Sequence, residues 1–182
     1  MNKALGMVEY TTVSSGMQAA DLIVKTAEVE ILEASTVCPG KYLVTFAGDL
    51  SAVRASIDAC RKKLPSRLID SFVLGNPHDD VIPAICGATD VSEVEALGVF
   101  ETYSAASAVV AADNTVKTSM VKLIEIRLAR GMCGKSYVII TGDVAAVTAA
   151  IERAKRDCGD TGMFLDSAVI PRPAKDLWKN IL

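Results

Sequence analysis

The spacing of apolar residues switches along the first 90 residues between a strand period and a helix period. Short apolar or alternating runs predict β-strands at about 3–10, 29–37, 41–47 and 68–74. Apolar positions three or four residues apart predict a helix at about 16–27, a second that begins after Asp49, and a short third near 78–85. The order β-α-β-β-α-β predicts a ferredoxin-like α+β fold, an antiparallel sheet with helices on one face.

The same pattern occurs a second time. The stretch ALGMVEYTTVSSGMQAADLIVKT begins at Ala4, and ALGVFETYSAASAVVAADNTVKT begins at Ala96, with 11 of 23 positions identical. A repeat of this length indicates that each copy is one structural unit. We therefore predict two tandem domains, residues 1–92 and 93–182.

The offset between the copies grows along the chain. It is 92 at the start, 94 where Gly40-Lys41 matches Gly134-Lys135, and 96 where Asp70-Ser71 matches Asp166-Ser167. The second copy thus has two extra residues in the loop that corresponds to TVCPGKY, residues 36–42.

Composition narrows the class of protein. The 182 residues are 51% hydrophobic and 23% charged, which is typical of a packed globular chain. The net charge of -3, with no basic cluster beyond Arg61-Lys62-Lys63, gives no indication of nucleic-acid binding. No signal peptide is visible, and the longest uncharged runs reach only about half of the ~20 residues of a membrane helix. We expect a soluble, cytoplasmic protein.

The five cysteines do not form a recognisable framework within one chain. The number is odd, and no CxxC pair occurs, so disulfides or a zinc site are not indicated. Cys60 and Cys86 are predicted to lie in the core, and Cys158 in a loop or at a helix end without a partner. A metal site would need thiols from different chains.

Cys38 lies in the tight loop of TVCPGKY. Pro39 fixes its own φ and Gly40 tolerates unusual φ, so this loop can hold Cys38 in a set direction. Cys133 lies one residue before the matching Gly-Lys of the second copy, where it is either an extra thiol or a packed side chain.

No catalytic set emerges from the sequence. The single histidine, His78, has no counterpart in the second copy and is expected in a surface turn. Glu9 recurs as Glu101, which fits a structural role. No phosphate loop, HExxH or GxSxG is present, so we do not expect an enzyme.

The two copies of ALGxxE…AAD…VKT…GK…GD(L/V), with VIPRP near the end of the second, resemble the shell proteins of bacterial microcompartments. The resemblance covers Ala4 to Leu182 and is strongest to the tandem-domain, PduT-like type of propanediol-utilisation compartments. It implies a structural protein in the shell, a homotrimer that forms a pseudohexameric tile and packs edge to edge with other shell proteins.

The resemblance also implies roles for particular residues. In this type, the thiol at the position of Cys38, from each of three chains, holds one [4Fe-4S] cluster per trimer at the central pore, for electron transfer across the shell or to an encapsulated redox enzyme. The pore loops would comprise Pro39, Gly40, Lys41, Met132, Cys133 and Gly134.

The tile edges are expected at three basic residues. Lys25 and Lys117 correspond to the family's edge lysine, and Arg172 corresponds to its edge arginine. The first copy has Asn76 in place of that arginine, so the two edge types are expected to differ.

Two alternatives remain open from the sequence. The tile could have a metal-free metabolite pore, or the chain could be a trimeric ferredoxin-like regulator that binds a small effector.

Overall fold

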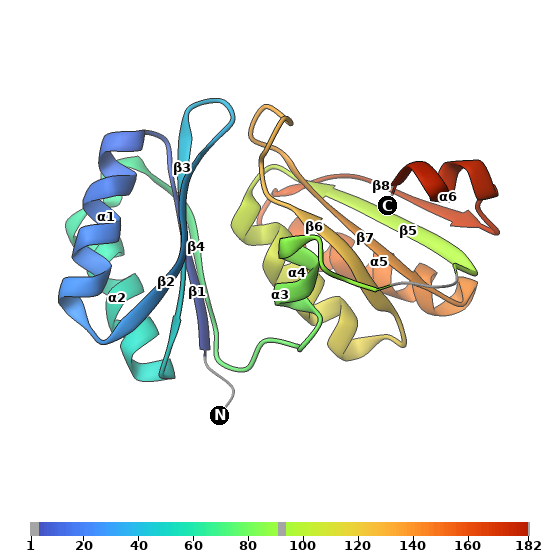
Figure 1. Cartoon of the computed structure of the whole chain (residues 1–182), viewed down its shortest axis with the longest axis horizontal. Helices are drawn as coiled ribbons and strands as arrows, with labels where there is room; N and C mark the ends of the chain where they lie inside the picture. The colour runs from blue at the N-terminus through green and yellow to red at the C-terminus, as the bar shows by residue number, and fades with distance from the viewer. Residues whose placement is uncertain (1–3, 91–93, 182) are drawn as a thin grey trace. The chain divides into compact units, whose positions relative to one another are not determined.

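Each copy of the repeat folds into a four-stranded antiparallel sheet (Figure 1). In the first sheet the order is β2-β3-β1-β4. Its strands are β1 (Ala4–Tyr10), β2 (Val29–Val37), β3 (Lys41–Gly48) and β4 (Leu68–Leu74). The accompanying helices are α1 (Val13–Thr26), α2 (Leu50–Lys63) and the 3-10 turn η1 (Pro65–Arg67). The predicted ferredoxin-like order is confirmed.

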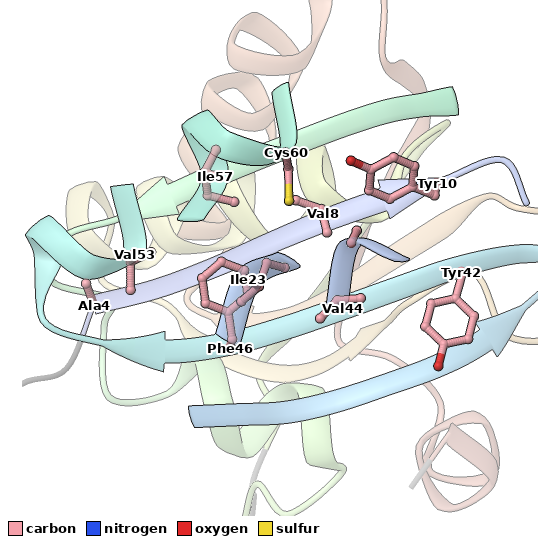
Figure 2. Close-up of a cluster of buried hydrophobic side chains, with 11 residues drawn as sticks. Ala4, Val8, Tyr10, Ile23, Tyr42, Val44, Phe46, Val53, Ile57 and Cys60 are labelled. Carbon is pink, nitrogen blue, oxygen red and sulfur yellow. The ribbon is translucent and has the colours of Figure 1, made fainter. Parts of the chain in front are cut away.

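The helices α1 and α2 cover one face of this sheet, as Figure 1 shows. Between these helices and the sheet lies a core of buried apolar side chains (Figure 2). The helices contribute Ile23, Val53, Ile57 and Cys60, and the strands contribute Val8, Val44 and Phe46. All of these are fully buried, so removal of their apolar surface from water is the main stabilising term of this layer.

The second sheet repeats this topology in the order β6-β7-β5-β8. Its strands are β5 (Ala96–Thr102), β6 (Lys122–Arg127), β7 (Ser136–Gly142) and β8 (Phe164–Pro171). The helices of this half are α3 (Val81–Cys86), α4 (Ala105–Thr118), α5 (Val144–Gly159) and α6 (Lys175–Ile181). A hydrogen bond of 2.8 Å from Asn114 Nδ2 to Asp157 Oδ2 joins α4 to α5.

The structure is a computed structural model. It describes residues 4–90 and 94–181, which divide into two compact units. The first unit contains the described residues up to Pro77 together with Ser104–Ala106 and Ala129–Gly134, and the second contains the other described residues. Two short segments from the second copy of the sequence therefore belong to the first unit. The predicted domain boundary between residues 92 and 93, and residue 3 of the predicted first strand, lie outside the described residues.

The two copies end their third strands in the same way but cap the next helix differently. Asp49 occupies the N-cap of α2 as predicted, but its side chain makes no capping hydrogen bond. Asp143, its counterpart before α5, accepts a hydrogen bond of 2.7 Å from Ala146 N. The start of α2 after Asp49 was therefore predicted correctly. Of the two aspartates, Asp143 makes the capping hydrogen bond and Asp49 does not.

The short helix expected near 78–85 forms as α3, but it belongs to the second unit and packs against β6. The prediction that Cys86 lies in the core is wrong, because its side chain is exposed. Val81 and Ala84, three residues apart, take the buried face of this short helix. Cys86 lies two residues beyond Ala84, on a different face.

Gly16 shows how tightly α1 packs on the sheet. A Cβ atom at this position would lie 2.3 Å from Tyr42 Cβ, far inside van der Waals contact. The helix begins three residues earlier than predicted, at Val13, and includes Gly16 although glycine has a low helix propensity.

We predict that Gly16→Ala lowers the free energy of unfolding by about 1–3 kcal/mol, because the new methyl group displaces Tyr42. Urea denaturation measures the change. Gly75→Ala is the control, since a Cβ there would meet only the Leu50 methyl groups at 3.5 Å. Equal stability of the two variants would contradict this packing.

Candidate functional site

Cys38 lies at the tip of the turn that joins β2 to β3. Gly40 N donates a hydrogen bond of 2.9 Å to Val37 O, which closes the turn. Gly40 has a φ of 92°, a conformation that glycine adopts without strain. The Cys38 thiol is exposed on this turn. The sequence-based expectation of a tight loop at Cys38 is confirmed.

A second loop contacts this turn within the first unit. Cys38 N donates a hydrogen bond of 3.2 Å to Ala129 O. Gly134 approaches from the other end of the same loop, and a Cβ there would lie 3.0 Å from Lys41 Cε and 3.1 Å from Pro39 Cδ. The two predicted pore-loop segments, 38–41 and 132–134, are therefore brought together in one unit.

Cys133 is exposed at the end of this second loop. Its φ of 52° is in the left-handed region, which a side chain other than glycine, asparagine or aspartate seldom occupies. Arg130 of the same loop forms an ion pair with Glu33 of β2. The thiol of Cys133 thus reaches solvent from a loop that is anchored at both ends.

The buried carboxylate of Glu9 lies beneath the two loops. Its side chain has no solvent exposure, and Oε1 accepts a hydrogen bond of 2.7 Å from Lys41 Nζ. Oε2 accepts one of 3.0 Å from Ala105 N, at the start of α4. Lys41 Nζ also donates to Gly134 O at 3.3 Å. One carboxylate and one ammonium therefore connect β1, the Cys38 turn, the second loop and the start of α4.

Burial raises the pKa of the Glu9 carboxyl above its ordinary value, and the hydrogen bond and charge of Lys41 oppose part of that rise. Asp70, the neighbour of Glu9 on β4, adds a small further rise to this pKa. Asp70 Oδ2 in turn accepts a hydrogen bond of 2.6 Å from Ser104 Oγ. Ser104 and Ala105 are both fully buried, so the start of α4 is held at two points.

Sequence reasoning assigned a structural role to Glu9 and a pore-loop position to Lys41 but missed that they form an ion pair. The signal was available, because both residues recur in the second copy as Glu101 and Lys135. Polar residues repeated at the ends of adjacent strands are candidates for such a pair.

The two buried cysteines, Cys60 and Cys158, are unsuitable as ligands beside Cys38. Burial raises the pKa of the Cys60 thiol, which disfavours the thiolate that binds metals, and the prediction that it lies in the core is confirmed. Cys158 lies near the end of α5 as predicted, but it has a partner, since its Sγ donates to Ser107 O at 3.9 Å. Within residues 4–90 and 94–181, no group of three or more His, Cys, Asp or Glu side chains is arranged to hold a metal.

The predicted edge residues lie on the surface of their units. Lys25 forms an exposed ion pair of 2.7 Å with Asp21, and Lys117 forms one of 2.6 Å with Asp113, which is buried. Arg172 is exposed, and its backbone N donates to Glu95 O. Lys117 also borders an open hollow of about 840 Å³ in the second unit, together with the half-buried His78. None of the described helices combines the length and hydrophobicity that crossing a membrane requires.

Comparison with known proteins decides the family. The family model described as the BMC domain matches residues 4–77 and again 96–173. The chain belongs to the BMC-domain family. It is 38% identical to the bacterial microcompartment shell protein PduT of Citrobacter freundii, over 100% of this chain and 99% of that protein. One copy matches EutK, a microcompartment shell protein of Escherichia coli K12, at 35% identity over 44% of this chain and 49% of that protein.

Solved structures agree with this assignment. A microcompartment protein from Desulfitobacterium hafniense DCB superposes with a TM-score of 0.87 at 41% identity, over 98% of this chain and 99% of that one. A fused permuted hexameric shell protein of the RMM microcompartment, at 21% identity, shares the fold with a TM-score of 0.67 over 88% of this chain and 85% of that one.

These relatives confirm the predicted class, a tandem-domain structural shell protein rather than an enzyme, and the predicted localisation in a microcompartment shell. Membership in this family argues against the small-effector regulator.

The buried pair gives a pH-dependent prediction. In Lys41→Met the Glu9 carboxylate loses its partner, so the pKa of Glu9 rises further. The folded state then holds the Glu9 proton to a higher pH than the unfolded chain, in which this carboxyl has its ordinary pKa of 4.5. The free energy of unfolding therefore falls as pH rises from this pKa through the raised pKa of the folded state. We expect a loss of about 3–5 kcal/mol at about pH 8 and a smaller loss at about pH 5.

Urea unfolding of Lys41→Met at the two pH values measures this difference. Lys25→Met is the control, because Lys25 pairs with Asp21 in an exposed position and its loss should cost little at either pH. If Lys41→Met loses the same free energy of unfolding at both pH values, the pKa of Glu9 does not depend on Lys41.

Proposed function

We propose that this shell protein forms a homotrimeric, pseudohexameric tile in which three Cys38 thiolates hold one [4Fe-4S] cluster at the central pore. The observation that carries the proposal is the position of Cys38. Its thiol is exposed at the tip of a turn, while its backbone N–H is bonded to Ala129 O at 3.2 Å. An exposed thiol on an anchored backbone suits a metal ligand better than a core position does.

The ligand count supports an assembly of several chains. A [4Fe-4S] cluster usually takes four thiolates. The described part of one chain offers no group of three ligands, so a site must draw on more than one copy. Threefold symmetry places one loop of each copy around the axis and supplies three equivalent thiols. The fourth iron would then bind water, a small molecule or a redox partner.

A bound [4Fe-4S] cluster would supply a one-electron redox centre. The part of this chain would be to position the thiolates: Ala129 O fixes the Cys38 backbone, and the Lys41–Glu9 pair fixes the base of the same turn. The turn would expose one side of the site to solvent, which suits electron transfer across the shell or to an encapsulated redox enzyme. Cys133 would be an accessory thiol beside it, reached from the adjoining loop.

The tile would also contact other shell proteins along its edges. Lys25, Lys117 and Arg172 are all at least partly exposed, as an edge contact requires. The edges would differ in strength, because Lys117 is paired with a buried aspartate and Lys25 with an exposed one. The arginine is present only in the second copy, where the first has Asn76.

Metal analysis of the whole protein tests the cluster. We expect wild-type protein, prepared without oxygen and supplied with iron and sulfide, to retain about four iron and four acid-labile sulfide per trimer. Cys38→Ser should retain almost none, because three ligands are lost at once. Cys86→Ser is the matched control, since it removes another exposed thiol of the same chain and should leave the iron content unchanged.

Equal iron in wild type and Cys38→Ser would contradict the cluster site. Wild-type trimers that bind no iron under these conditions would favour the metal-free pore instead, and the assignment as a shell protein would stand in either case.

A further inference from the structure

The residues that hold the start of α4 at Glu9 recur in the second unit, where no helix start in the described residues is bound to them. In the first unit, Glu9 and Asp70 are adjacent across β1 and β4 and receive the start of α4. In the second unit, Glu101 and Asp166 are adjacent in the same way across β5 and β8. We call the first arrangement the filled joint and the second the open joint.

The aspartates of the two joints make the same local hydrogen bond. Ser71 N donates to Asp70 Oδ1 at 2.7 Å, and Ser167 N donates to Asp166 Oδ1 at 2.8 Å. The lysine of the filled joint, Lys41, also has a counterpart, Lys135, which directly precedes β7.

The open joint lacks the group that fills the first one. The Glu9 side chain has no exposure, whereas Glu101 is only half-buried and Asp166 is exposed. Across residues 4–90 and 94–181, neither the Glu101 carboxylate nor the Lys135 ammonium makes a hydrogen bond. A carboxylate that is half removed from water without a protein donor can be buried further only if a donor from another chain approaches it.

The missing group is present elsewhere in the same sequence. The filled joint receives Ala105, the first residue of α4, and the repeat offset of 92 makes Val13 its counterpart, the first residue of α1. Both helices are 14 residues long. Ala105 is fully buried, whereas Val13 is half-buried and the next residue, Ser14, is exposed. Since the first N–H groups of a helix have no partner within it, Val13 N is an available donor.

The lysine contact repeats in the same way. Lys41 reaches Gly134 O in the filled joint, and the counterpart of Gly134 is Gly40 in the Cys38 turn. Gly134 is buried, whereas Gly40 is exposed and a Cβ there would meet nothing within 4 Å. Each chain therefore has one helix start and one loop that match an open joint and do not occupy one.

We infer that the open joint binds a second copy of this chain: Glu101 of one chain accepts a hydrogen bond from Val13 N of the next, and Lys135 of the first chain bridges Glu101 and Gly40 O of the second. The inference rests on the trimer proposed above and names the contacts that close it. A carboxylate at a helix start is favoured by the helix dipole as well as by the N–H group.

The arrangement is head-to-tail, because the joint and the group that fills it lie on different parts of the chain. Such contacts form a closed ring when the rotation between copies permits it. Three open joints, filled in turn, would alternate with three filled joints around the tile. Because Gly40 belongs to the Cys38 turn, each contact would also set the position of one Cys38 relative to the neighbouring chain.

Hydrogen exchange at the Val13 amide tests the joint directly. In wild-type oligomer we expect this amide to exchange at least about tenfold more slowly than in Glu101→Ala, because the mutation removes its acceptor. We expect Glu101→Ala trimers to dissociate at a concentration at least about tenfold higher, measured by mass photometry on dilution. Glu152→Ala removes an exposed glutamate of α5 and should change neither quantity.

The outcomes separate this inference from the proposed function. If wild type is a trimer but Val13 exchanges as fast as in Glu101→Ala, the joint is wrong and the tile remains. If Glu101→Ala trimers resist dilution as well as wild type does, the joint is wrong as well. If wild type is a monomer at all concentrations, both the joint and the proposed trimer fail.

Discussion

The carboxylate of Glu9 is excluded from water, and a buried charge is tolerated only when charged and polar partners surround it. Lys41 and the first N–H of α4 are those partners. Because Lys41 also reaches Gly134 O, the requirement to satisfy one carboxylate brings the Cys38 turn and the Ala129–Gly134 loop together. The buried Glu9 carboxylate of β1 requires these partners, and they set the position of the candidate site.

In the proposed trimer, the duplication repeats this contact between one chain and the next. Two copies with the same Glu, Lys and Asp at equivalent strand positions create two joints, and the start of α4 fills one of them. The copies differ where function is proposed: the first has Cys38 in its turn, and the second has Met132 at the matching position. A trimer of this chain would have six similar joints, three within chains and three between them. It would place only three equivalent Cys38 thiols near its centre.

Much of the fold could be predicted because apolar spacing determines which face of an element is buried. The bounds of β2 and β4, Val29–Val37 and Leu68–Leu74, coincide with the predicted ranges. Prediction failed where a tertiary contact decided the outcome. Cys86 lies off the buried face of a helix of six residues, and the close fit of Gly16 against Tyr42 depends on how α1 packs on the sheet. For the site, the turn and its exposed thiol could be predicted from Pro39 and Gly40, whereas the pairing of Glu9 with Lys41 depends on strand register.

A crystal structure of the oligomer, grown without oxygen from protein supplied with iron and sulfide, is the most direct measurement. Three chains around one axis, with anomalous iron density bounded by the three Cys38 Sγ atoms, are the expected result. Chains that meet in threes with only water between their Cys38 turns, or with the Cys38 thiols directed away from the axis, would contradict the proposed site.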